Sequence, residues 1–155
     1  MAIELSTAGI LVKWITEATA GTRPTTGYHT LRGVVSIPDM NPEPNLLQTT
    51  PLSATKYHTH IFGLRNLQTM GMTVNDYTDF RTDWSSLMTA WGTAKAAGKG
   101  MWVEIAIPGL NSFYYPVEPV ERGFGGAEVD TVLQTTVYFA ITGEPVEAAA
   151  STGGA

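Results

Sequence analysis

Alternating apolar and polar positions predict a series of β-strands. In residues 8–19, Ile10, Val12 and Trp14 recur at every second position and share one face of a strand. Residues 29–37 alternate in the same way through Leu31, Val35 and Ile37, with Gly33 between them. Further strands are predicted at residues 56–64, 101–107 and 131–142.

One segment has a helical period instead. Between Asp76 and Gly98 the apolar residues follow the spacing i, i+4, i+7, i+8 and i+11, which places them on one stripe: Phe80, Trp84, Leu87, Met88 and Trp91. Asp76 is the expected N-cap and Gly98 the expected stop. Strands on both sides of a single helix predict a mainly β fold, an antiparallel sandwich or barrel on which the helix packs.

Prolines disturb two segments of this pattern. "NPEPNLLQTTPLS", residues 41–53, has no clean period, and its three prolines exclude a helix and cannot donate to a central sheet ladder. It nevertheless carries Leu46, Leu47 and Leu52, so we expect a stiff, apolar loop over residues 38–55. Pro116 and Pro119 predict a short or bulged edge strand at "SFYYPVEPV".

Length and composition indicate one globular domain. The chain has 155 residues, 43% of them hydrophobic and 15% charged, which is enough to bury a core. We assign the domain to residues 1–146 and expect the small-residue segment 147–155 to be a flexible tail. The N-terminal residues lack the positive charge of a signal peptide, and no run approaches the about 20 apolar residues that cross a membrane.

Charge is unevenly distributed. The net charge is −5, and residues 76–155 hold ten acidic and four basic residues, whereas residues 1–75 hold four acidic and five basic ones. This balance argues against a protein that wraps nucleic acid by neutralising phosphates. It suits electrostatic matching between copies, or repulsion of another polyanion.

No motif predicts catalysis, a cofactor or a metal. The phosphate-loop, nucleophile-elbow and HExxH signatures are absent, and there is no cysteine. His58 and His60 share a strand face, but no acidic third ligand lies near them in sequence, so two half-exposed polar residues are the favoured interpretation. Asp76, Asp79 and Asp83 are explained by capping and by the helix dipole.

Two further patterns have structural explanations. Trp84 and Trp91 would suit a sugar-stacking platform, but beside Leu87 at helical spacing they are expected in the core. The glycine-rich "GFGG", residues 123–126, is interpreted as a hairpin turn because no helix follows it.

The segment "PEPNLLQTTPLSATKYHTHIFGLRNL" resembles the major tail tube proteins of phages with long, non-contractile tails. In that family a Pro-Glu pair precedes an apolar residue, a Thr-Thr-Leu-Ser-like run and an extended Y-x-x-x-I-x-G-L strand. The counterparts here are Pro42, Glu43, Leu46 or Leu47, Thr49, Thr50, Leu52, Ser53, Tyr57, Ile61, Gly63 and Leu64. "MTVNDYTDFRTDWSSLMTAW" is similar to the start of the family's single helix, whereas Pro51 interrupts the Thr-Thr-Leu run and departs from the pattern.

The resemblance implies a structural virion protein rather than an enzyme. Six copies would form a ring, rings would stack into a hollow tail tube, and genomic DNA would pass through without specific binding. Expected partners are further copies and the tape-measure, tail-tip and terminator proteins, with synthesis in the bacterial cytoplasm. The segment between the early strands would contact a neighbouring subunit or ring through Pro42, Glu43, Pro44, Leu46, Leu47, Thr49, Thr50, Pro51 and Leu52.

Two other classes of protein stay open. A tube of a contractile tail or injection system would share the architecture and require a sheath partner. A monomeric β-sandwich that binds a ligand or a carbohydrate through exposed aromatic side chains would instead stay monodisperse. An enzyme would need a pocket with converging polar groups, which no motif predicts.

Overall fold

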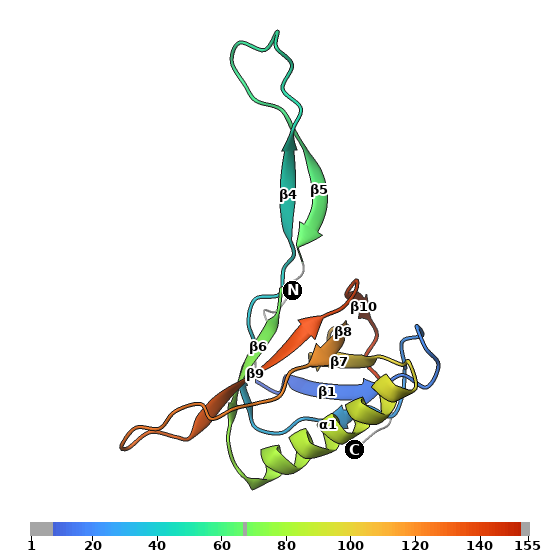
Figure 1. Cartoon of the computed structure of the whole chain (residues 1–155), viewed down its shortest axis with the longest axis vertical. Coiled ribbons are helices and arrows are strands. Elements are labelled where there is room, and N and C mark those ends of the chain that lie inside the picture. The colour runs from blue at the N-terminus through green and yellow to red at the C-terminus, as the bar shows by residue number, and fades with distance from the viewer. Residues whose placement is uncertain (1–7, 67, 153–155) are drawn as a thin grey trace. The chain divides into compact units, whose positions relative to one another are not determined.

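The computed structural model describes residues 8–66 and 68–152, which belong to two compact units (Figure 1). We call Asp39–Gln68 the hairpin and the remainder, Met1–Pro38 with Thr69–Ala155, the body. The hairpin is inserted between two strands of the body, β3 and β6, that pair with each other. No helix in the described part of the chain is long and apolar enough to cross a bilayer.

The body is one antiparallel sheet with a single helix against one face (Figure 1). The strand order is β2-β1-β7-β8-β9-β6-β3, and β10 pairs with β8 off this path. The strands are β1 (Leu11–Thr16), β2 (His29–Thr30), β3 (Val34–Ser36), β6 (Met70–Asn75), β7 (Met101–Ala106), β8 (Ser112–Pro119), β9 (Gln134–Ile141) and β10 (Val146–Ala148). The predicted fold class, mainly antiparallel β with one packed helix, is confirmed.

The main core lies between this sheet and helix α1 (Thr78–Ala96). Phe80, Trp84 and Leu87 are buried there, and the Trp84 ring meets the Phe139 ring of β9 edge-on at 5.6 Å. Met88 and Trp91, the other two members of the predicted stripe, are only half-buried. The helical period therefore found the correct face, whose buried residues continue to Ala94 near the end of the helix, but it did not predict that Met88 and Trp91 are partly exposed.

The start of α1 differs from the prediction. The N-cap is Tyr77, which is extended and makes no side-chain capping hydrogen bond. The predicted cap, Asp76, instead forms an ion pair with Arg81 at 2.6 Å. At the other end Gly98 has a φ of +73°, the left-handed conformation expected of a helix stop.

The opposite face of the sheet carries a second, smaller core. Tyr28, Trp102 and Tyr114 pack together there, and Val146 and Ala148 of β10 pack against them. Residues 147–152, expected as part of a flexible tail, are thus largely hydrogen-bonded to the sheet, and the predicted domain boundary at residue 146 falls inside β10. Residues 153–155 of that segment lie outside the described residues.

Strand β8 is central, not the predicted edge strand. It pairs with β7 on one side; on the other side β10 pairs with residues 112–114 and β9 with residues 117–119. The Pro116 carbonyl accepts a hydrogen bond from the Thr142 amide at 2.8 Å. The N and C=O groups of a strand residue point to the same side of the strand. The Pro116 nitrogen therefore faces the gap between the residues that pair with β10 and those that pair with β9. A missing N–H at this point interrupts no hydrogen-bonded strand pairing.

The predicted strand over residues 29–37 is divided in two. Gly33 adopts a φ of +88° between β2 and β3, so the alternation does not continue through it: Leu31 is buried, whereas Val35 is exposed. Strand β6 was missed, although Met70, Met72 and Val74 alternate and are fully buried. Its short period-two pattern adjoins the start of α1 and was interpreted with the helix.

Candidate functional site

The hairpin consists of β4 (Glu43–Gln48) paired with β5 (His60–Asn66). The loop predicted over residues 38–55 is therefore wrong for residues 43–48, which form β4, and the strand predicted at 56–64 begins at His60. Pro44 lies opposite Arg65, next to a register shift. In a two-stranded sheet both strands are edges, so a proline beside a bulge is tolerated there.

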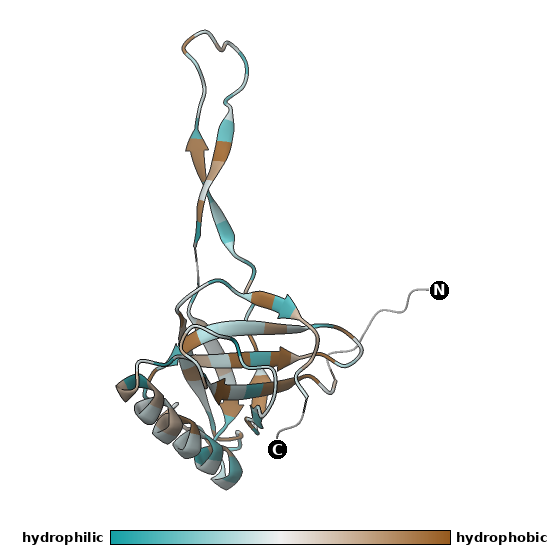
Figure 2. Ribbon diagram, turned by 90° about the vertical axis from the view of Figure 1, so that its right-hand side faces the viewer, coloured by the Kyte–Doolittle hydropathy of each residue, from teal (hydrophilic) through white to brown (hydrophobic). Residues whose placement is uncertain are grey.

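Apolar side chains occupy both faces of the hairpin. Leu46 lies opposite Phe62, and the next pair, Leu47 opposite Ile61, points to the other face because strand side chains alternate. All four are more than half exposed, Phe62 to 75%. Figure 2 shows these hydrophobic segments on both strands.

The hairpin lacks a core of its own. Every residue of β4 is exposed. An isolated two-stranded hairpin is marginally stable in water, and contiguous exposed apolar surface marks sites of interaction. Burial of these faces against another molecule would supply the stabilisation that the hairpin lacks.

A polar network shapes the end of the hairpin. The Thr49 amide donates to the Thr59 carbonyl at 2.7 Å, and the Thr59 amide donates to Thr50 Oγ1 at 2.8 Å. His58 Nδ1 lies 3.0 Å from Gln48 Nε2. In the described residues no group of three His, Cys, Asp or Glu side chains could hold a metal ion, so this histidine is part of the hairpin's hydrogen bonding.

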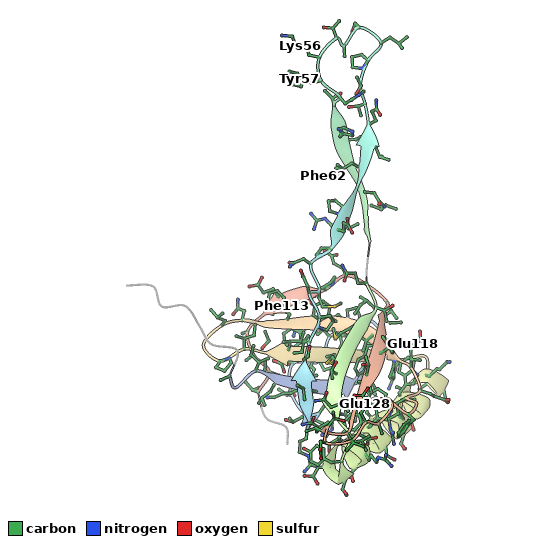
Figure 3. The ribbon with its side chains drawn as sticks, turned by 90° about the vertical axis from the view of Figure 1, so that its left-hand side faces the viewer. Lys56, Tyr57, Phe62, Phe113, Glu118 and Glu128 are labelled. Atoms are coloured by element: carbon green, nitrogen blue, oxygen red, sulfur yellow. The ribbon has the colours of Figure 1, made fainter. Side chains whose placement is uncertain are left out.

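Beyond this network lies the tip, which we define as residues 51–57. Leu52 and Tyr57 are almost completely exposed, and Lys56 and Tyr57 lie together at this end of the hairpin (Figure 3). All nine residues that the resemblance implies for the interface lie within the hairpin, on β4 or beside it. Their contact with a neighbouring subunit remains a prediction.

A second apolar surface was missed from the sequence. The β8–β9 loop, residues 120–133, exposes Phe124, Val129 and Val132. Residues 123–126 lie within this long loop and not at the tight hairpin turn predicted there. The signal in the sequence is the presence of five large apolar residues in a glycine-rich stretch whose other residues are small or polar: Val120, Phe124, Val129, Val132 and Leu133.

The second core covers only part of the sheet face that lies opposite α1, and the rest of this face is accessible to solvent. Here Glu118 lies opposite Ala140 in the β8–β9 register, and Gly71 lies opposite Tyr138 in the β9–β6 register. Tyr138 is 48% exposed and Thr136, one step along the same face, is also exposed. We call these residues, with Thr73, the open face; they include one acid and no base.

The acidic residues near α1 are engaged in ion pairs. Arg32 binds Asp83 at 2.9 Å and approaches Asp79 at 3.4 Å. Hydrogen bonding from Arg32 lowers the pKa of Asp83, and hydrogen bonding from Arg81 lowers the pKa of Asp76. A pocket beside Arg32, lined also by Trp14, His29 and Ser86, therefore contains a neutralised ion pair together with His29, whose ring lies 4.9 Å from the Trp14 ring.

The fold matches chains from solved tail and baseplate structures over nearly its whole length. A chain from the tail of an empty gene transfer agent (GTA) particle, refined with C6 symmetry, has a TM-score of 0.62 at 11% identity, covering 94% of this chain and 100% of that one. A chain from the six-fold symmetrised baseplate of the anti-feeding prophage (AFP) has a TM-score of 0.60 at 7% identity, with 94% and 97% covered. A chain from the cap that terminates the AFP tube has a TM-score of 0.56 at 10% identity, with 98% and 91% covered.

No protein-family model and no curated protein matches the chain. At identities this low the structural matches show a shared fold, mainly antiparallel β-sheet with one helix.

Proposed function

We propose that this chain is a structural subunit of a phage-type tail tube. Six copies form a ring, and stacked rings enclose a lumen through which DNA passes without specific binding. The observation that carries the proposal is the hairpin, whose two apolar faces have no core of their own. The shared fold with chains from six-fold tail and baseplate structures supports this kind of assembly.

The hairpin acts as the joint between copies. Docking it on a neighbour removes apolar side chains from water at about 25 cal/mol per Å². Prolines at positions 42, 44 and 51 restrict the free hairpin, so less conformational entropy is lost when it docks. Sheet edges provide a second kind of joint, since β3 ends the sheet with an exposed Val35.

The open face is the proposed lumen wall. It carries Glu118 and uncharged side chains, and the whole chain has a net charge of −5. A surface without bases forms no ion pairs with phosphates, so the main contribution to non-specific DNA binding is absent. The chain acts in the virion tail with tape-measure, tail-tip and terminator proteins, and performs no catalysis.

Electron microscopy of concentrated protein, with light-scattering mass, tests the proposal. We expect rings or hollow tubes for the natural chain. The double variant Leu46→Ser/Phe62→Ser removes one apolar cross-strand pair of the hairpin and should raise the concentration needed for assembly at least tenfold, while the thermal unfolding of the body stays unchanged. Ser85→Ala, at an exposed position on α1, is the matched control. A monomer at all concentrations, also in the presence of tail-tip proteins, would contradict a tube subunit.

A component of a tube end is the second candidate. The AFP matches are a baseplate chain and a chain of the cap that terminates the tube, so this fold occurs in more than one part of such a particle. A tube-end component would stop at a single ring, whereas a tube subunit would stack further. The same images distinguish the two.

A further inference from the structure

The tip of the hairpin is apolar and carries one positive charge. Leu52 and Tyr57 are 107% and 81% exposed. Lys56 is the only Lys, Arg, Asp or Glu between Pro44 and Leu64. The tip thus combines exposed apolar side chains with one base, and Figure 3 shows Lys56 and Tyr57 at the end of the hairpin.

The β8–β9 loop has the opposite character. Its exposed apolar residues Phe124, Val129 and Val132 are accompanied by Glu121, Glu128 and Asp130 against a single base, Arg122. Figure 3 places Glu128 in this part of the body. The loop therefore combines exposed apolar surface with a net charge of −2.

The β8–β9 loop is held in a defined shape. A Cβ on Gly125 would overlap the Gln134 carbonyl oxygen, so the loop backbone lies directly against the start of β9. Thr131 Oγ1 donates to the Glu128 carbonyl at 3.0 Å, and Asp130 has a φ of +61°. This turn leaves Val129 exposed to 89% beside Glu128 and Asp130.

We infer that the tip, residues 51–57, docks on the β8–β9 loop, residues 120–133, of a second copy of this chain. The pairing joins two apolar surfaces and sets Lys56 against the loop acids. Contact between two tips would bring two lysines together, and contact between two β8–β9 loops would bring the acids together, both of which are unfavourable. The charges thus favour a head-to-tail contact, which propagates from copy to copy because each chain offers both surfaces.

The hairpin is long enough for this contact. About 15 residues in each direction can extend up to about 50 Å, whereas a folded body of this size has a diameter of about 35 Å. A tip can therefore reach a loop on an adjoining copy. The inference rests on the proposed assembly and adds which two surfaces meet.

Cysteine cross-linking tests the contact directly, because the natural chain has no cysteine. An affinity-tagged Tyr57→Cys chain is mixed with an untagged Val129→Cys chain under assembly conditions and oxidised. We expect a disulfide-linked heterodimer on a non-reducing gel. The matched control pairs Tyr57→Cys with Ser85→Cys, an exposed position on α1, and should give at least ten times less heterodimer.

The possible outcomes test the tip–loop contact and the proposed function separately. Equal heterodimer yields for positions 129 and 85, in samples that form rings or tubes, would overturn the tip–loop contact and leave the proposed function intact. A linked monomer of the double variant Tyr57→Cys/Val129→Cys would also overturn it, since the contact would then be within one chain. Failure of the natural chain to assemble, also in the presence of tail-tip proteins, would contradict the proposed function itself, and the contact with it.

Charge exchange provides a second measurement. Lys56→Glu alone should raise the critical concentration for assembly several-fold, because it places like charges across the contact. Adding Glu128→Lys and Asp130→Lys to Lys56→Glu should restore assembly toward that of the natural chain. Equal critical concentrations for all three proteins would contradict the inference.

Discussion

Glu104 is a fully buried carboxylate in the middle of the body's sheet. Its burial alone would raise its pKa, but hydrogen bonds from Ser151 and Tyr114 outweigh this effect and hold the pKa below its ordinary value of 4.5. The Ser151 amide donates to Glu104 at 3.0 Å, and the Tyr114 hydroxyl donates to Glu104 at 3.2 Å. The charged side chain thus fastens the C-terminal segment to the sheet.

Glu104→Gln should destabilise the body in a pH-dependent way. A group whose pKa is lower in the folded state stabilises it above the unfolded pKa, and this contribution is lost as pH falls through the folded pKa. The difference in unfolding free energy between the natural chain and Glu104→Gln should therefore be largest near neutral pH and shrink below pH 4.5. Urea unfolding at several pH values measures it. An exposed control, Glu144→Gln, should show no comparable change, and a pH-independent difference for Glu104→Gln would contradict the role of its charge.

Gly33 and Gly92 should respond oppositely to alanine. Gly33 has a φ of +88°, and a Cβ there would lie 2.7 Å from Tyr77 Cε1 and 3.2 Å from the Asn75 carbonyl oxygen. Gly33→Ala should cost about 2 kcal/mol of unfolding free energy or more. Gly92 lies inside α1 with no atom near its added Cβ, so Gly92→Ala should stabilise the chain by about 0.8 kcal/mol. Both changes are measured by urea unfolding; effects of the same sign would refute the argument.

At the scale of elements, the buried residues of α1 extend from Phe80 to Ala94, but its two tryptophans are covered unequally. Trp84 is buried between Phe80 and Phe139, whereas Trp91 is only half-buried. Trp84→Ala should lower the unfolding free energy by about 3–5 kcal/mol, and Trp91→Ala by about 1–2 kcal/mol. Calorimetry of the two variants provides the comparison. Equal losses would mean that the whole stripe predicted from the helical period is buried.

The sequence predicted elements whose pattern is local and missed those that depend on their neighbours. Helix α1 and strand β7 follow from periodicity alone. The edge position expected for β8 was wrong because the place of Pro116 depends on where β10 gives way to β9. Strand β4 was missed because Pro44 lies inside it, with Pro42 and Pro51 close by, and a proline is compatible with a strand when that strand is an edge. The leucines of β4 did mark the hairpin as unusual, but its pairing with β5 was not predicted.

At the scale of the whole molecule, the structure shows where some of the excess acidic residues of the C-terminal half lie. Several acids of residues 76–155 are paired or buried: Asp76, Asp83 and Glu104 contact other groups of the body. The exposed acids of the β8–β9 loop and Glu118 on the open face are among those available to other molecules, as are the exposed Glu144 and Glu147. The net charge therefore overstates how acidic any one surface is, and the effect on DNA depends on which residues face the lumen.

If the open face lines the lumen, Glu118→Lys should make assembled tubes retain DNA. Each copy then offers a base in place of an acid, and contacts with phosphates release counterions, so retention should fall steeply as salt rises from 50 to 200 mM. Tubes assembled with fluorescent duplex DNA are pelleted after nuclease treatment, so that only enclosed DNA is counted. Glu144→Lys makes the same charge change in the β9–β10 connection and should protect no DNA. Protection of DNA by both variants, or by neither, would contradict the assignment of the open face to the lumen. Assembly through the hairpin is tested separately, by the Leu46→Ser/Phe62→Ser variant.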